Sequence, residues 1–165
     1  MRALFISAAS LALAACGSSD SGTIETEDGE AAYDVDQGAD GTVSGEFTGP
    51  DGETASYEVG ANADVELPDG FSLYPGAQVV SSMAAQSSDG GGSMVVMNID
   101  GSADDIIAYY RKEAEAAGVE IQSVIASNGS QIIGGESADG IAFSVNAFPG
   151  AEGKTTAQLV VGRGE

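Results

Sequence analysis

The stretch SADDIIAYYRKEAEAAG, residues 102–118, has the pattern of a complete helix. Ser102 and Asp105 have capping-box spacing, in which the Ser hydroxyl accepts a backbone N–H three residues on and the acid reaches back. Gly118 supplies the left-handed residue that commonly ends a helix. Apolar side chains recur at helical spacing between these signals: Ala103, Ile106, Ile107, Tyr110, Ala114 and Ala117. We therefore expect a helix that begins after Ser102 and ends before Gly118.

Strand-like runs flank this helix on both sides. The runs are 77–85, 94–99, 119–126, 131–134, 141–148 and 155–161. Asn128-Gly129 and Asp139-Gly140 separate three of them, and both pairs are typical of tight hairpin turns with positive φ. Short connections make neighbouring strands antiparallel. Residues 70–165 are thus predicted to form one α+β domain, with one helix on one face of an antiparallel sheet of about six strands.

The two faces of this sheet are predicted to differ. The face under the helix is expected to carry Val95, Met97, Ile99, Ile121, Ile125, Ile141, Phe143, Val145, Leu159 and Val161. The opposite face, with Ser, Gln, Asn and Thr, is expected to face water.

The chain before residue 70 is more polar. In residues 41–69, two polar runs, 42–48 and 54–59, flank the turn residues 49–52, Gly-Pro-Asp-Gly, which predicts a polar β-hairpin. Residues 16–40 consist mainly of Ser, Gly, Asp and Glu, with too few apolar groups to offset the entropy of ordering. We interpret them as a disordered acidic tether, and a docking segment for a basic partner is the alternative.

Cys16 is the only cysteine of the chain and ends the run LAAC, residues 13–16. Arg2 and an apolar stretch over residues 3–13 precede it. This arrangement resembles the lipobox of a bacterial lipoprotein signal peptide. The resemblance implies that residues 1–15 are removed, that the Cys16 sulfur receives diacylglycerol, and that acyl chains such as palmitate anchor the protein to a membrane.

Two other interpretations of the N-terminus remain. An uncleaved transmembrane helix fits poorly, because residues 3–15 would span only about 20 Å against about 30 Å of hydrocarbon. A plain secretory signal would leave a free thiol at Cys16. The position after Cys16 is Gly17, not the Asp that resembles an inner-membrane retention signal in lipoproteins. The resemblance therefore implies the outer membrane, with the protein on the periplasmic face.

The chain is strongly acidic, with a formal net charge of −21. Residues 17–69 contain no Lys or Arg, so the cationic surface that nucleic acid requires is missing. Acidity of this kind keeps an exported protein soluble. The expected partners are the membrane, through lipidated Cys16, and an envelope protein or cell-wall component.

The sequence offers little for catalysis. There is no His, and Cys16 is unavailable as a nucleophile once acylated. A Ser nucleophile would need Lys112 or Lys154 as its base, and both are expected to face water. The alternating acids of residues 34–41 resemble a calcium loop, but Ala39 stands where that loop needs Gly and Gly45 where it needs an acid. We therefore predict a protein that is not an enzyme and has no cofactor or metal site.

One segment combines aromatic and basic side chains. Tyr109, Arg111 and Lys112 could together contact a carbohydrate or an acidic peptide. The alternative is structural, since helical spacing turns Tyr110 toward the sheet and leaves Arg111 and Lys112 in water.

The motifs of the C-terminal part resemble a recurrent domain of small bacterial envelope lipoproteins. They are LPDGF at residues 67–71, YPGA at 74–77, the helix of 102–118 and TTAQLVVG at 155–162. The resemblance implies no catalytic residues. Together with the lipobox, it favours a non-enzymatic structural or interaction module of the cell envelope. A domain that binds a small ligand or a divalent cation is the alternative.

Overall fold

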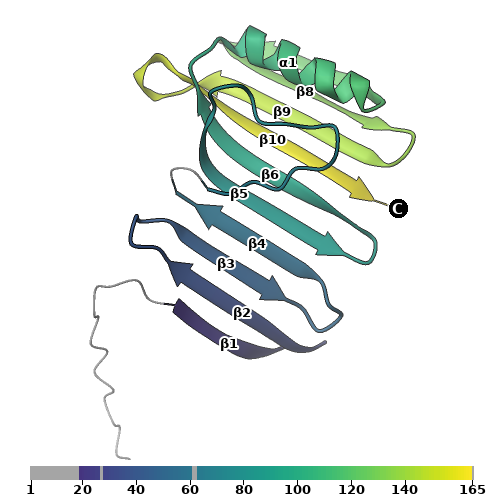
Figure 1. The fold of residues 1–165 in the computed structure, drawn as a ribbon. Helices are drawn as coiled ribbons and strands as arrows, with labels where there is room; N and C mark the ends of the chain where they lie inside the picture. Colours follow the sequence, from purple (N-terminus) through teal and green to yellow (C-terminus); the bar gives the residue numbers. More distant parts are fainter. Residues whose placement is uncertain (1–18, 27, 61–62, 165) are drawn as a thin grey trace, which may run out of the picture.

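The protein folds as a broad antiparallel sheet with a single helix on one face (Figure 1). The computed structural model describes residues 19–26, 28–60 and 63–164. Within them, ten strands form one sheet in the order β1-β2-β3-β4-β5-β6-β10-β9-β8-β7. The predicted α+β class is confirmed. The predicted strand number of about six is wrong, because the sheet has ten strands.

The strands that precede the helix are β1 (Ser19–Thr26), β2 (Gly29–Gln37), β3 (Val43–Thr48), β4 (Thr54–Val59), β5 (Gln78–Ser87) and β6 (Gly90–Ile99). The helix α1 spans Ala103–Ala116. It is followed by β7 (Val119–Ser127), β8 (Ser130–Ser137), β9 (Ile141–Pro149), the short 3-10 turn η1 (Ala151–Gly153) and β10 (Thr155–Gly164).

The predicted helix boundaries and one hairpin turn are confirmed. The Ser102 hydroxyl accepts a hydrogen bond from the backbone N–H of Asp105 at 3.2 Å. Gly118 has a φ of 83°, as its predicted role at the helix end requires. Asn128 and Gly129, with φ values of 51° and 79°, form the turn between β7 and β8. The strand-like runs around the helix correspond to β5–β10.

The core lies between the sheet and a cover made of two parts. The helix packs on β7, β8 and β9, and its Ile106 and Tyr110 are fully buried. The segment 63–77 crosses the same face beside the helix (Figure 1). Its Phe71 ring stacks on Phe143 of β9, with centroids 5.6 Å apart, and the Asp64 carbonyl accepts a hydrogen bond from Ser82 of β5.

Most of the predicted core residues are buried, but Ile125 is not. The β7–β8 register shifts between Ile121 and Ser123, so Gln122 forms a β-bulge. A one-residue shift turns every later side chain to the other face. Ile125 consequently faces away from the helix and is 57% exposed, and Ile133 of β8, absent from the predicted core, is fully buried.

The segment expected to be a disordered tether forms two strands instead. Residues 19–26 pair with 29–36, and β2 pairs with β3 of the predicted polar hairpin. Hairpin strand β4 pairs with β5. The predicted tether, the predicted hairpin and the predicted domain therefore all contribute strands to one sheet. In β2, the alternation of Ala31, Tyr33 and Val35 with acids gives one apolar side, as a strand requires.

Tyr110 ties the crossing segment to the helix. Its hydroxyl accepts the backbone N–H of Tyr74 at 3.0 Å and donates to the Met97 sulfur. We expect Tyr110→Phe to lower the free energy of unfolding by about 1–3 kcal/mol, because the Tyr74 N–H loses its partner in a partly buried place. Urea titration measures the change. In Tyr109→Phe, Ser72 keeps its hydrogen bond to Glu113, so an equal loss there would contradict this assignment.

Candidate functional site

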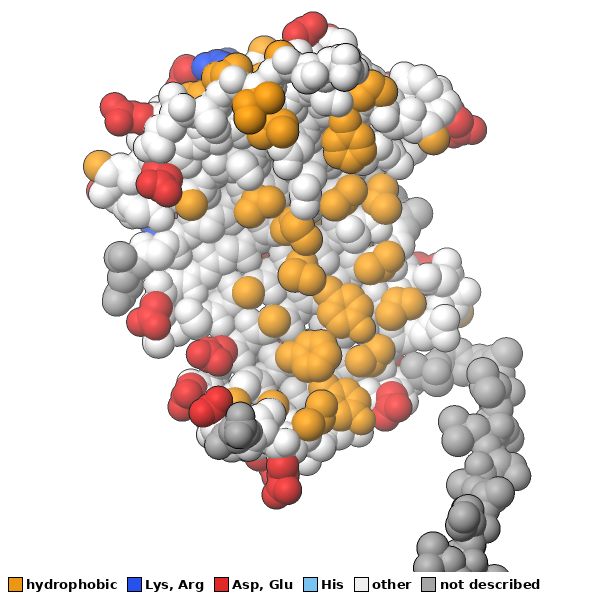
Figure 2. Space-filling view, turned by 180° about the vertical axis from the view of Figure 1, so that it is seen from behind, with side chains coloured by type: hydrophobic (Ala, Val, Ile, Leu, Met, Phe, Trp, Pro, Cys, Tyr) orange, Lys and Arg blue, Asp and Glu red, His pale blue; other side chains and the backbone are white. Residues whose placement is uncertain are grey.

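The face of the sheet opposite α1, called the open face below, has no covering layer in the described residues (Figures 1 and 2). Directly paired residues of antiparallel strands share a face, so the register assigns each side chain to one side. One row along the open face is Val35, Gly45, Tyr57, Met83, Met94, Val160 and Ser144. A neighbouring row is Tyr33, Phe47, Ala55, Ala85, Gly92, Gly162 and Ala142.

The open face is apolar to an unusual degree. Figure 2 shows hydrophobic side chains in a nearly continuous strip across it. Large hydrophobic side chains that lie exposed there are Ile24, Phe47, Val59, Met83, Ile125, Ile132, Phe148 and Val160. The expected Ser, Gln, Asn and Thr side chains lie on the open face of β5, β6, β10 and β9, beside the apolar strip; they include Ser81, Asn98, Gln158, Thr156, Asn146 and Ser144. Contiguous exposed apolar surface is a general characteristic of interaction sites.

Charge on the open face is confined to its outer strands, where Asp20 of β1, Glu136 of β8 and Glu120 of β7 lie. Seven adjacent strands, β2–β6 with β10 and β9, place no charged residue on it. The acids of β2, β3 and β4 all point to the helix side of the sheet; they are Glu30, Asp34, Asp36, Glu46 and Glu58. Since no Lys or Arg of residues 19–26, 28–60 and 63–164 faces it, the described open face offers no cation to a phosphate or carboxylate. It suits a neutral, apolar surface.

Two tyrosines on the open face lie over glycines of neighbouring strands. A Cβ on Gly22 would come within 2.9 Å of the Tyr33 hydroxyl, and a Cβ on Gly45 would overlap the Tyr57 ring. Rings that cover a strand glycine in this way replace its missing side-chain packing and pin the register. Tyr33, Phe47, Tyr57 and Met83, on β2–β5, form what we call the aromatic ridge.

The other half of the open face is hollowed. A depression of about 620 Å³ lies over β7–β10. Small residues make up most of its open-face lining, namely Ser123, Gly134, Ala142, Ser144 and Gly162, and Val160 and the carboxylate of Glu136 lie beside them. We call it the small-residue hollow. A second depression of about 540 Å³ lies beside Phe47 and is floored by residues such as Ala55 and Ala85.

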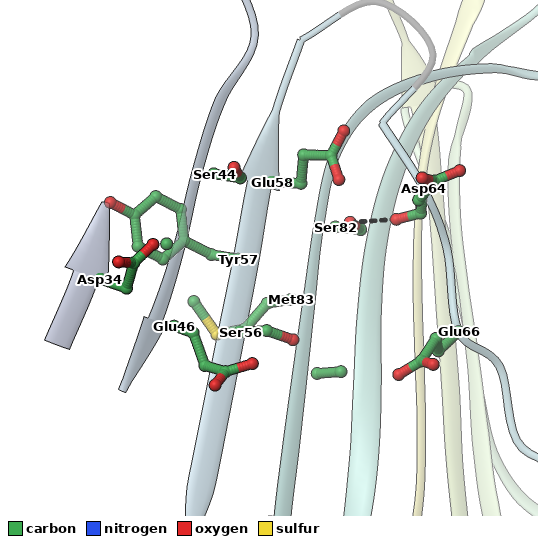
Figure 3. Close-up of a pocket in the computed structure, with 12 residues that line it drawn as sticks. Asp34, Ser44, Glu46, Ser56, Tyr57, Glu58, Asp64, Glu66, Ser82 and Met83 are labelled. Carbon is green, nitrogen blue, oxygen red and sulfur yellow. Dashed lines mark hydrogen bonds between the residues drawn. The ribbon is translucent and has the colours of Figure 1, made fainter. Parts of the chain in front are cut away.

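The helix side of the N-terminal strands carries an acidic groove of about 320 Å³ (Figure 3). Its carboxylates come from three strands and from the crossing segment: Asp34, Glu46, Glu58, Asp64 and Glu66. Across residues 19–26, 28–60 and 63–164, no group of three or more such ligands is arranged to hold a metal ion. The groove can therefore attract cations but has no built coordination site.

The alternating acids of residues 34–41 belong to a strand and its turn. Asp34 and Asp36 lie in β2. Asp40 lies in the following turn, where its carboxylate accepts the Thr42 N–H at 3.1 Å, and this bond lowers the pKa of Asp40. They form a hairpin, not a loop closed around an ion.

The predicted ligand contacts do not come together as a group. The Tyr109 hydroxyl bonds to the Ser72 hydroxyl at 2.8 Å and donates to the Leu73 carbonyl at 3.4 Å, and burial raises the pKa of Tyr109. Its hydrogen bonds therefore serve the attachment of the crossing segment. Arg111 is half-buried and Lys112 exposed, and no hydrogen bond joins either side chain to Tyr109 within the part of the chain that the structure describes.

Two further predictions concern single residues. Lys154, one of the two lysines considered as a base, hydrogen-bonds the Gln78 side chain at 3.0 Å and lies 3.8 Å from Asp100, so no Ser contacts its amine in the described chain. Cys16, the predicted lipidation site, lies outside the described residues, as does the predicted signal peptide 1–15.

Sequence reasoning missed the open face. The signal was the period-two alternation in residues 30–36 and 43–47, which the abundance of acids and glycines obscured.

No helix of the described chain is long and apolar enough to cross a bilayer.

Comparison with known proteins gives one partial similarity. Residues 79–155 match a family described as START domain-like, which covers just under half of the chain, from β5 to the first residue of β10. No curated protein and no solved structure matches the chain. The chain is thus similar to a START domain-like unit between β5 and the start of β10, and β1–β4 lie outside this similarity.

Proposed function

We propose that this chain is a lipid-anchored protein of the bacterial envelope and that it works as a binding module, not as an enzyme. Its binding surface is the open face of the sheet. Its proposed anchor is Cys16, on the basis of the lipobox resemblance, and Gly17 after it favours the outer membrane, with the protein on the periplasmic side. The partner presents a neutral, apolar surface.

The observation that carries this proposal is the apolar strip across uncharged strands. The chain has a net charge of −21, yet the acids of β2–β4 all lie on the helix side of the sheet and the aromatic ridge lies on the open face. Exposing Phe47 and Met83 to water costs free energy that a partner would recover, at about 25 cal/mol for each Å² of apolar surface covered. The pattern is therefore best explained by an interaction.

The partial START domain-like match supports binding as the activity, because such domains are generally ligand-binding. It also favours a second candidate, in which a small neutral apolar ligand occupies a depression of the open face. The absence of a Lys or Arg there disfavours ligands with a phosphate or carboxylate head group.

A photoreactive probe on the open face tests the proposal in the native membrane. We expect a benzoylphenylalanine at Phe47, 44% exposed, to form a discrete adduct on irradiation. The matched control is the same probe at Val124, which is 58% exposed but pairs with Ile133 and so faces the helix side. The masses of the adducts are measured by gel and mass spectrometry.

The adduct mass separates the candidates. A protein-sized adduct at Phe47 alone supports the binding module, and a gain of less than about 1 kDa, the size of a lipid or similar ligand, supports the small-ligand candidate. No adduct at Phe47, or equal adducts at both positions, would remove the open face as the binding surface.

A further inference from the structure

We infer that the open face is covered by the open face of a second copy of this chain, in a two-fold dimer of packed sheets. This inference rests on the proposed binding role of the open face and names its occupant. It is carried by three properties of the face: its shape, its lack of charge and its area.

The shape of the open face is complementary to itself. A two-fold axis along the strand direction, between β5 and β6, places β4 over β10, β3 over β9 and β2 over β8 of the second copy. Three residues of the aromatic ridge, Tyr33, Phe47 and Tyr57, then lie over the small-residue hollow. Phe47 faces the row of Ala142, and Tyr57 faces that of Val160. In the row that holds Tyr33 and Phe47, the positions on the other half are Gly92, Gly162 and Ala142, which leaves room for rings of the second copy.

The residues nearest the axis fit the same arrangement. Met83 of β5 pairs with Met94 of β6 within one chain, so the axis brings both methionines of both copies together. Met83 is 47% exposed in the single chain. Flexible thioether side chains adapt well to such a contact.

The charge and the area also favour self-association. The six strands β3–β6, β10 and β9 face one another across the axis and place no charged residue on the open face, so two acidic chains meet without opposing carboxylates at the centre. At a strand spacing of about 4.8 Å and strand lengths of about 20–25 Å, these strands offer about 600–700 Å², and the contact of β2 with β8 adds to this area. A standard interface buries about 800 Å² on each partner.

The arrangement agrees with the proposed anchor. An axis along the strands keeps the strand ends of both copies at the same level. Ser19 of each β1, the first described residue after Cys16, then lies at the same end of the dimer. Both lipid anchors can therefore reach one membrane.

Sedimentation equilibrium of the full chain with Cys16→Ser, which removes the anchor and the only native thiol, tests the dimer. We expect a dimer at micromolar concentration that tightens with added salt, since screening weakens repulsion between the acidic chains. Met83→Asp should weaken dimerisation about 100-fold or more, because it places carboxylates at the axis. Val124→Asp, on the helix side, is the matched control and should leave it unchanged.

A crosslinking experiment tests the arrangement of the strands. In the Cys16→Ser chain, Phe47→Cys combined with Ala142→Cys should be linked into covalent dimers by a short bis-maleimide. Either substitution alone should not be, because identical β3 strands would lie about five strand spacings, or 24 Å, apart. Linking by the single variants would overturn the proposed axis.

A chain that stays monomeric up to about 100 µM, or a dimer that Met83→Asp leaves intact, would overturn the inference. These outcomes are distinct from failure of the proposed function. A monomeric chain whose Phe47 probe still forms an adduct with another protein keeps the open face as a binding surface with a different occupant.

Discussion

Leu159→Ala is expected to lower the free energy of unfolding by about 2–5 kcal/mol. Leu159 lies in β10, near the middle of the sheet, and is fully buried between its register partners Val95 and Val145, which are also fully buried. Truncation leaves a cavity that the surrounding β-strands cannot close. Because folded domains are stable by only about 5–15 kcal/mol, this is a large share of the total. Urea denaturation followed by circular dichroism measures it.

The control for this prediction is Val124→Ala, which also truncates an aliphatic side chain in a strand. Val124 is 58% exposed at the edge strand β7, so its truncation should cost about 0.5 kcal/mol or less. A comparable cost for both variants would mean that the packing around Leu159 does not hold the sheet together.

Cys16→Ala is expected to move nearly all of the protein out of the membrane fraction, as soluble or unprocessed chain. Alanine has no sulfur to accept a lipid, and acyl chains contribute about 0.8 kcal/mol for each buried methylene. Incorporation of a labelled palmitate analogue should be lost. The intact mass of the native protein should match an acylated chain from Cys16 to Glu165.

Ser18→Ala, two residues away, provides the matched control and should keep the label and the membrane location. Unchanged labelling of the Cys16→Ala variant would remove the proposed anchor. An intact native mass that fits an unlipidated chain would do the same, and the outer-membrane location would have to be abandoned with it.

The sequence was most informative where local chemistry decides structure. The Ser102 cap, the Gly118 stop and the Asn128-Gly129 turn depend on the hydrogen bonds or φ values of a few residues, and each is found in the predicted place. The alternation of Val95, Met97 and Ile99 identified a core strand, because side chains two residues apart in a strand lie on the same face. These signals cover the stretch from β5 to β10 with α1, which contains the whole region similar to a START domain-like unit.

The N-terminal strands were missed because their stability comes from neighbours. Residues 19–37 have few apolar groups, and an isolated hairpin with that composition is marginal in water. In the sheet, β2 gains β3 as a partner, and Tyr33 covers Gly22 of β1. Long-range pairing of this kind leaves only a weak local signal, the alternation in residues 30–36, so composition indicated a tether where the structure has strands. The open face was missed for the same reason, since it is created by the joining of both halves.

The β-bulge at Gln122 also affects whether strands of other molecules can add to the edge of the sheet. In the described part of the chain, the ten strands form an open sheet whose edge strands are β1 and β7, and a flat apolar edge strand is a template for fibre formation. β7 carries the exposed side chains of Val124 and Ile125, which makes it the more hazardous edge. The bulge interrupts its ladder and increases the local twist, so another strand cannot add in register. The irregularity that turned Ile125 outward therefore also protects the sheet against aggregation at β7.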